Sequence, residues 1–283
     1  MIDEIIKETQ VYDKDNYIKW KNELKQKAYQ LVDEALNEIK SNPHFLKQYF
    51  DVQSKFDAYT SRNALLILRQ LPTAIQLRDK EGWREMKAKY IEKEPNKILL
   101  LEPGRAFKNA EGKLITPINA KEVIDISETN IKPTIRSYDK KIILQGLILQ
   151  SPNKIKIVDS LENGKLCEWN QEDNTFSVCR NDDADLVISS FVTELAKSKL
   201  YETFNEIDDT KAKCISYMIC KKYGIISNLD NIDKLSEKYS TMDNISIADD
   251  LGNMESIVSD INKQLNIYLY DKRKEQNNER QVR

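Results

Sequence analysis

The period of the apolar residues changes along this chain, and that change limits the folds open to it. From residue 17 to residue 39, apolar side chains such as Leu24, Ala28, Leu31 and Ala35 recur at the spacing of one helix face. Residues 98–101 instead form a continuous apolar run, which is typical of a buried strand. Because further helical segments and short strands both follow, the sequence predicts an α+β fold.

The remaining elements are predicted from the same two periods and from the residues that end them. In the first half we expect helices at 17–39, after Pro43 and at 58–68, and strands at 74–77, 98–101 and 123–127. In the second half we expect helices at 140–149, 185–201, 209–223 and 254–270, and an antiparallel meander of strands 155–158, 166–169 and 175–179. A polar stretch around Pro133 separates the halves, so the predicted domains are residues 1–135 and 136–283.

The composition indicates a polar, soluble chain. Of its 283 residues 32% are charged, and no run approaches the roughly 18 apolar residues that a membrane helix needs. The N-terminal residues lack the basic-then-apolar pattern of a signal peptide. The 4 cysteines form no Cys-x-x-Cys pair, which favours reduced thiols over the alternatives, a disulfide or a structural zinc site. We therefore expect a cytoplasmic protein without a membrane partner.

The charges are distributed unevenly along the chain. Residues 55–108 contain 12 Lys/Arg and 7 Asp/Glu, a net charge of +5. Residues 159–209 contain 4 Lys/Arg and 13 Asp/Glu, a net charge of −9. A basic region attracts phosphates and an acidic region repels them, so the two halves are predicted to have different partners.

The basic stretch also contains aromatic and amide side chains. Proteins that bind single strands combine cations that follow the phosphates with aromatic faces on which bases stack. The candidate nucleic-acid-binding residues are Tyr59, Arg62, Asn63, Arg69, Arg78, Trp83, Arg84, Lys87 and Lys89. The alternative interpretation buries Tyr59 and Trp83 in the core and lets Asn63 and Gln70 bond to backbone groups.

Glu194 lies in a segment that resembles the metal-binding helix of a zinc peptidase. Such a helix carries His-Glu-x-x-His, because two histidines four residues apart can bind one metal ion from the same face. Here Thr193 and Lys197 stand in the histidine positions, and the only histidine of the chain is His44. We therefore expect no catalytic residue, no metal and no cofactor. The spacing of three residues allows Lys197 to take the place of a metal and pair with Glu194.

Several motifs of the first half resemble the N-terminal domain of ArdC-type antirestriction proteins. They are FDAYTSRN at 56–63, QLPTA at 70–74, the pair Gly82-Trp83, and VIDISET at 123–129, in which Glu128 replaces a glutamine of the family pattern. In the second half, Glu194-Leu195-Ala196, Ala212 and the run SYMICKKYG at 216–224 resemble the LtrC-like branch of these proteins. That branch accompanies conjugative plasmids and transposons of Gram-positive bacteria.

The resemblance implies a single-stranded DNA-binding domain followed by a zincin-like metallopeptidase domain, here degenerate because both histidines are missing. It predicts a non-catalytic single-stranded DNA-binding accessory protein of a conjugative element, and not an enzyme. A second hypothesis is a pseudo-peptidase module that holds a host or element-encoded protein in the decayed cleft. A third is a live metallopeptidase with a substitute ligand set, to which Asp209 would contribute.

Overall fold

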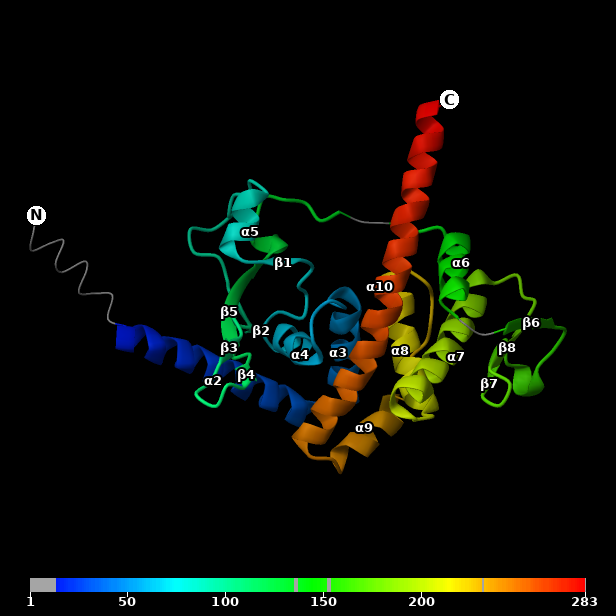
Figure 1. Ribbon diagram of the computed structural model, residues 1–283, viewed down its shortest axis with the longest axis horizontal. Coiled ribbons are helices and arrows are strands. Elements are labelled where there is room, and N and C mark those ends of the chain that lie inside the picture. Colours follow the sequence, from blue (N-terminus) through cyan, green and yellow to red (C-terminus); the bar gives the residue numbers. More distant parts are fainter. Residues whose placement is uncertain (1–13, 135–136, 152–153, 231, 283) are drawn as a thin grey trace, which may run out of the picture. The chain divides into compact units, whose positions relative to one another are not determined.

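A computed structural model describes residues 14–134, 137–151, 154–230 and 232–282 (Figure 1). The contacts within the chain divide it into two compact units, each of which is described by itself. The first unit comprises Met1–Asn37, of which residues 14 onward are described, and Arg62–Pro133. The second unit comprises Glu38–Ser61 and Thr134–Arg283.

These units differ from the predicted domains, 1–135 and 136–283, in the place of residues 38–61. The helix of that segment, α3 (Pro43–Lys55), contacts α8 (Asp209–Lys222) and α9 (Ile232–Ser240) and therefore belongs to the second unit. The predicted boundary between residues 135 and 136 lies outside the described residues. The apolar face of α3 is evident in the sequence, but the segment that covers it is more than a hundred residues away.

The first unit is built on a three-stranded antiparallel sheet with the order β1-β5-β2. Its strands are β1 (Leu77–Arg78), β2 (Ile98–Pro103) and β5 (Ile118–Asp125). Ile98 is opposite Val123 and Pro103 is opposite Ile118, and residues 98–101 are buried, as predicted for a core strand. The unit also contains α2 (Lys14–Ile39, up to Asn37), α4 (Ser61–Gln70) and α5 (Lys80–Glu85).

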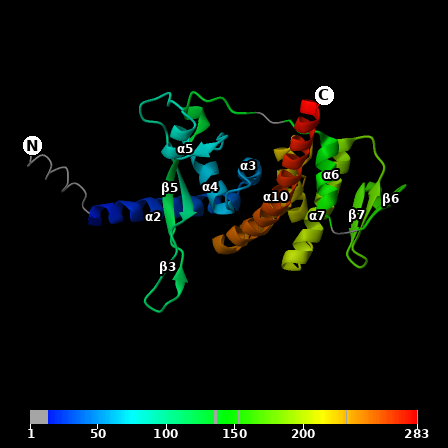
Figure 2. The same cartoon turned by 45° about the horizontal axis from the view of Figure 1, so that its top comes forward.

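A hairpin of β3 (Phe107–Lys108) and β4 (Leu114–Ile115) extends from the ends of β2 and β5, and it projects from the rest of the first unit (Figure 2).

Two amide side chains of α4 bond along the outer edge of β2. The Asn63 amide donates to the carbonyl of Leu101 and accepts from its N–H, at 2.8 Å each. Gln70 makes the same pair of bonds with Leu99, at 3.0 and 2.9 Å. Because an edge strand presents unpaired backbone groups on one side, these amides replace a missing neighbour strand. The interpretation that bonds them to the backbone is confirmed.

The turn after β5 is closed by Asp125 and Trp83. The buried Asp125 carboxylate accepts hydrogen bonds from the N–H groups of Ile75, Gln76 and Ser127, at 2.8–3.0 Å. The indole N–H of Trp83, on α5, donates to the carbonyl of Ile124 at 2.9 Å. These bonds join the chain before β1, helix α5 and the end of β5 into one core.

The second unit consists of six helices and a small sheet among its described residues. Besides α3, α8 and α9, its helices are α6 (Lys140–Gln150), α7 (Ala184–Phe204) and α10 (Asn244–Val282). Helix α7 lies against α8, and α10 contacts both α6 and α8. The sheet strands are β6 (Lys154–Val158), β7 (Cys167–Asn170) and β8 (Thr175–Cys179).

The predicted meander is wrong in its strand order. The observed order is β6-β8-β7, with β6 parallel to β8 and β7 antiparallel to it. A central strand has neighbours on both sides, and β8 contains the buried Phe176 and Cys179. Strand β6 carries Lys154 and Lys156, which suit an exposed edge.

The helix ends follow their capping residues. Asn42 accepts a hydrogen bond from the N–H of Phe45, with Pro43 at the first position of α3. Gly224 follows α8 with a φ of 71°, the left-handed conformation typical of a glycine that ends a helix. The sequence analysis missed the short helix α9 and began the last helix at 254. Among the described residues, no helix combines the length and the apolar character needed to cross a bilayer.

Candidate functional site

Glu194, in the general-base position of the peptidase-like segment, lies on α7 with its side chain only 8% exposed. Its Oε2 accepts a hydrogen bond from the backbone N–H of Trp169, on β7, at 3.1 Å. Its Oε1 accepts a hydrogen bond from the Lys197 ammonium at 3.0 Å. The predicted contact between these two side chains is confirmed, and the carboxylate is turned toward the sheet.

Lys197 also reaches a second carboxylate. Its Nζ lies 2.8 Å from Oδ1 of Asp209, the first residue of α8. Burial alone would lower the pKa of Lys197, but the bond to Asp209 and the charge of Glu194 outweigh it, so this pKa is raised. The bond to Lys197 lowers the pKa of Asp209. Lys197 and Asp209 therefore both stay charged at neutral pH; we call Glu194, Lys197 and Asp209 the Lys197 cluster.

The Lys197 cluster does not fit a metal ion. The ammonium lies between the two carboxylates that would otherwise attract a cation, and it repels one. The Thr193 hydroxyl, at the other histidine position, donates to the carbonyl of Ser189 at 2.8 Å. Within the part of the chain that the structure describes, no group of three or more His, Cys, Asp or Glu side chains is arranged to hold a metal. The cluster is an internal ion-pair site.

The six cations predicted to bind nucleic acid all lie in the first unit and are exposed. They are Arg62 and Arg69 on α4, Arg78 on β1, Arg84 on α5, and Lys87 and Lys89 in the segment after α5. Arg69 forms an ion pair with Glu34 at 3.6 Å, and Arg84 forms one with Glu81. Exposed pairs of this kind contribute only about 0–1 kcal/mol, so they do not prevent an arginine from meeting a phosphate.

Three of the predicted site residues need correction. Trp83 is completely buried and bonded to Ile124, so its ring offers no face to a base. Asn63 is buried, and both the nitrogen and the oxygen of its side-chain amide bond to Leu101 on β2. Tyr59 is half-buried and belongs to the second unit, whereas the six cations belong to the first. The interpretation that buries Trp83 is therefore the right one.

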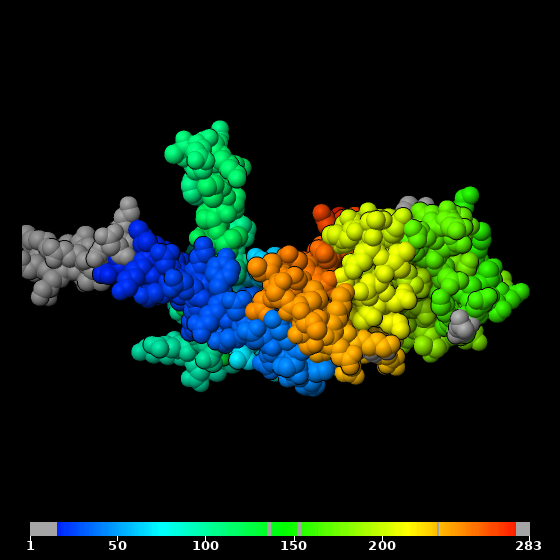
Figure 3. Space-filling model, turned by 90° about the horizontal axis from the view of Figure 1, so that it is seen from below, coloured from blue at the N-terminus to red at the C-terminus, as the bar shows by residue number. Residues whose placement is uncertain are grey.

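The exposed aromatic side chains of the first unit are ones that the sequence analysis did not select. Tyr17 and Trp20 on α2 are 45% and 43% exposed, and Phe107 on the projecting hairpin is 51% exposed. Figure 3 shows this hairpin standing out from the surface. A signal existed for the first two: they lie seven and four residues before Leu24, so they continue the apolar spacing of a predicted helix toward its start. Both residues precede the basic stretch of residues 55–108, so the charge pattern does not point to them.

Solved structures of the antirestriction ArdC protein from the R388 plasmid are similar to this chain. The Mn(II)-bound crystal structure aligns with a TM-score of 0.57 and 10% sequence identity, over 84% of this chain and 97% of that one. The metal-free crystal structure aligns with a TM-score of 0.51 and 10% identity, over 73% and 85%. No protein-family model and no curated protein sequence matches this chain.

At 10% identity, the similarity establishes a shared α+β fold. The predicted resemblance to ArdC-type proteins is thus supported at the level of the fold. The zincin-like nature of the second unit, the binding of single-stranded DNA and the absence of catalysis stay predictions.

Proposed function

We propose that this protein is a non-catalytic, antirestriction-type accessory protein of a conjugative plasmid or transposon, which binds single-stranded DNA through its first unit. The observation that carries the proposal is the fold that this chain shares with an antirestriction protein over 84% of its length. The protein would act in the cytoplasm by covering single-stranded DNA that enters the cell.

The Lys197 cluster supports the non-catalytic part of the proposal. A metallopeptidase needs an ion that activates water and a carboxylate that accepts the proton of that water. Here the carboxylate of Glu194 is buried and held by an ammonium group and a backbone N–H. We propose that Lys197 stabilises this region of the second unit in place of a metal ion.

The exposed cations support the DNA-binding part of the proposal. They project from α4, β1, α5 and the segment after α5 of the same unit, whereas the strongly acidic stretch, residues 159–209, lies in the other unit. Cations that meet phosphates bind without regard to base sequence. We therefore expect weak, salt-dependent binding without sequence preference.

Fluorescence anisotropy of a labelled single-stranded oligonucleotide, with duplex DNA as competitor, tests this proposal. We expect saturable binding that prefers the single strand, with log affinity falling by about 0.7 per unit of log salt for each phosphate neutralised. Three charge reversals should abolish it: Arg62→Glu, Arg69→Glu and Arg84→Glu. No binding by the unmodified protein, even at low salt, would reject the proposal.

A matched set of reversals in the second unit controls for the change in net charge. Lys156, Arg180 and Lys238 are also exposed cations in surface ion pairs. The variant that carries Lys156→Glu, Arg180→Glu and Lys238→Glu has the same net charge as the first triple variant. If both variants lose binding equally, the binding reflects overall charge and the first unit is not the site.

A hollow on the second unit favours the second candidate function, a module that holds a protein partner. A pocket of about 330 Å³ lies between α7, α8 and the segment after α8, and is lined by Ser189, Thr193, Ser216 and Tyr217 among others. The buried Glu194 does not line it. In cells that carry a restriction system, a triple arginine variant that loses DNA binding and keeps its protective effect would favour this second function.

A further inference from the structure

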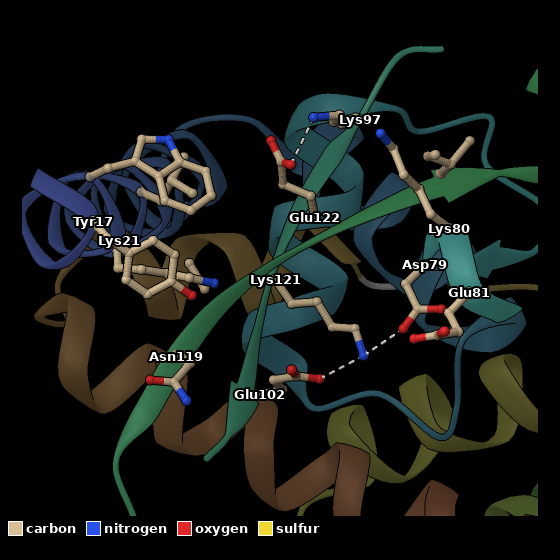
Figure 4. A pocket seen from close by; sticks show the side chains of 14 residues that line it. Tyr17, Lys21, Asp79, Lys80, Glu81, Lys97, Glu102, Asn119, Lys121 and Glu122 are labelled. Carbon is tan, nitrogen blue, oxygen red and sulfur yellow. Dashed lines mark hydrogen bonds and ion pairs between the residues drawn. The ribbon is translucent and has the colours of Figure 1, made fainter. Parts of the chain in front are cut away.

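A pocket of the first unit brings together exposed aromatic rings and polar groups that are far apart in the sequence. Its volume is about 600 Å³, within the range of about 300–1,000 Å³ typical of small-ligand sites. One wall is the start of α2, with Tyr17, Trp20 and Lys21, and the others come from the β1–α5 turn, β2 and β5 (Figure 4).

The aromatic wall is accessible and carries a cation. Tyr17 and Trp20 are almost half exposed, and their ring centroids lie 5.8 Å apart. The Lys21 ammonium lies 5.7 Å from the centre of the first ring and 5.3 Å from that of the second. Exposed ring faces beside a cation are what a stacked base and its phosphate need.

The walls opposite α2 are polar and carry little net charge. They contain three lysines and four carboxylates, a formal net charge of −1. Lys97 pairs with Glu122 at 2.8 Å, and Lys121 bridges Asp79 and Glu102 at 3.0 and 3.1 Å (Figure 4). Such a wall presents hydrogen-bond donors and acceptors without a strong field, which suits the polar edge of a base better than a phosphate.

Asn119 adds an exposed amide at the start of β5, in the same pocket. An amide can both donate to and accept from a base edge.

We infer that this pocket binds nucleobases of single-stranded DNA, with Tyr17 and Trp20 as the stacking surface and Lys21 beside the phosphates of the bound strand. The inference rests on the proposed function and gives it the aromatic contacts that Trp83 and Tyr59 do not supply. A protein partner fits this pocket less well, because it would have to bury two lysines and the three carboxylates paired with them away from water. A base needs only the ring faces and a few edge contacts.

Intrinsic fluorescence tests the inference directly. The chain has 3 tryptophans, all within the described residues, and Trp83 and Trp169 are 0% and 8% exposed, so Trp20 supplies the quenchable emission. We expect oligo(dT) to quench this emission, and an abasic oligomer of equal length and charge to leave it unchanged. Equal quenching by both oligomers would overturn the inference, since stacking requires a base.

Anisotropy with alanine variants provides the second measurement. Tyr17→Ala with Trp20→Ala should weaken binding of oligo(dT) about 5- to 100-fold and leave the salt dependence unchanged, because no cation is removed. Tyr29→Ala is the matched control: Tyr29 is an exposed aromatic on α2 with Lys25 beside its ring, and it does not line the pocket. Circular dichroism confirms that each variant folds.

The outcomes separate the two proposals. If the unmodified protein binds DNA and the Tyr17/Trp20 variant binds within twofold of it, the pocket inference is wrong and the proposed function stands. If the unmodified protein binds no DNA, both are wrong. If sedimentation shows a dimer that only the Tyr17/Trp20 variant loses, and oligo(dT) does not quench, the aromatic wall binds a second copy and the inference is wrong.

Discussion

Replacing Lys197 by methionine should destabilise the second unit strongly, because the change leaves a buried carboxylate without its cation. Methionine keeps most of the length of the side chain and removes only the charge and the hydrogen bonds. In the native structure Glu194 and Lys197 have side chains that are 8% and 14% exposed, whereas Asp209 is 73% exposed. The lost partner therefore matters for Glu194 far more than for Asp209.

The size of the effect follows from this burial. Removing one member of a buried pair costs about 3–5 kcal/mol, and an exposed pair contributes about 0–1 kcal/mol. Glu194 keeps the hydrogen bond from Trp169, so we expect a loss of about 2–4 kcal/mol in the free energy of unfolding. At about 2–4 °C per kcal/mol, the melting temperature should fall by roughly 4–16 °C.

Urea unfolding followed by circular dichroism measures this loss, and two further variants serve as its control and its rescue. Lys199→Met is the control: Lys199 lies on the same helix, is 19% exposed, and pairs with Asp260, which is 46% exposed, so its loss should stay below about 1 kcal/mol. Adding Glu194→Gln to Lys197→Met should restore half or more of the stability. Equal losses for the two lysine variants, or no recovery in the double variant, would refute the reasoning.

Three further predictions concern a restored metal site, the hydrogen bonds of Asn63 to β2, and the response of stability to pH. Thr193→His with Lys197→His should create a zinc site that uses the two new imidazoles and the Asp209 carboxylate, which then no longer pairs with an ammonium, and stoichiometric zinc in the purified variant measures it; absence of zinc would show that the helix no longer presents these positions to one ion. Asn63→Asp keeps the acceptor for the N–H of Leu101 and loses the donor to its carbonyl. It should therefore lower the urea midpoint by an amount equivalent to about 1–3 kcal/mol. An unchanged midpoint would show that these two hydrogen bonds do not stabilise the unit. Burial, with repulsion from a nearby aspartate second, raises the pKa of Glu255 to about 7 from its usual 4.5, so the folded state holds an extra proton and loses stability as the pH rises from about 4.5 through 7. Glu255→Gln removes that loss, and its stability relative to the native protein should grow by about 1–3 kcal/mol between pH 5 and pH 8; a difference that does not change with pH would contradict this.

The sequence predicts most of the long helices because their apolar spacing is a local property. It does not predict the order of the strands, because a strand pattern such as 155–158 records which face is buried and not which strand lies beside it. The same limit explains Trp83. Whether that ring is exposed depends on the carbonyl of Ile124, 41 residues away, to which its N–H donates.

The candidate site shows the same division between local and distant information. The contact of Lys197 with Glu194 could be predicted, since three residues separate them on one helix. The contact with Asp209 depends on how α8 lies against α7, and the spacing of residues in the sequence does not predict that packing. The pocket beside Tyr17 and Trp20 was missed because its other walls come from residues 79 to 124.

The position of α3 has a consequence for how the chain folds during synthesis. Residues 62–133 interrupt the second unit as an insertion, so α3 leaves the ribosome long before the helix it packs on. The hydrogen bond from Tyr217 to Asp51 spans 166 residues, and contacts of such separation form late. Until α8 is made, the nascent chain carries the apolar face of α3 uncovered, and a fragment that ends near residue 135 would keep it uncovered permanently. Such fragments should aggregate, whereas a chain that joins residues 38–61 directly to 134–283 contains every segment of the second unit.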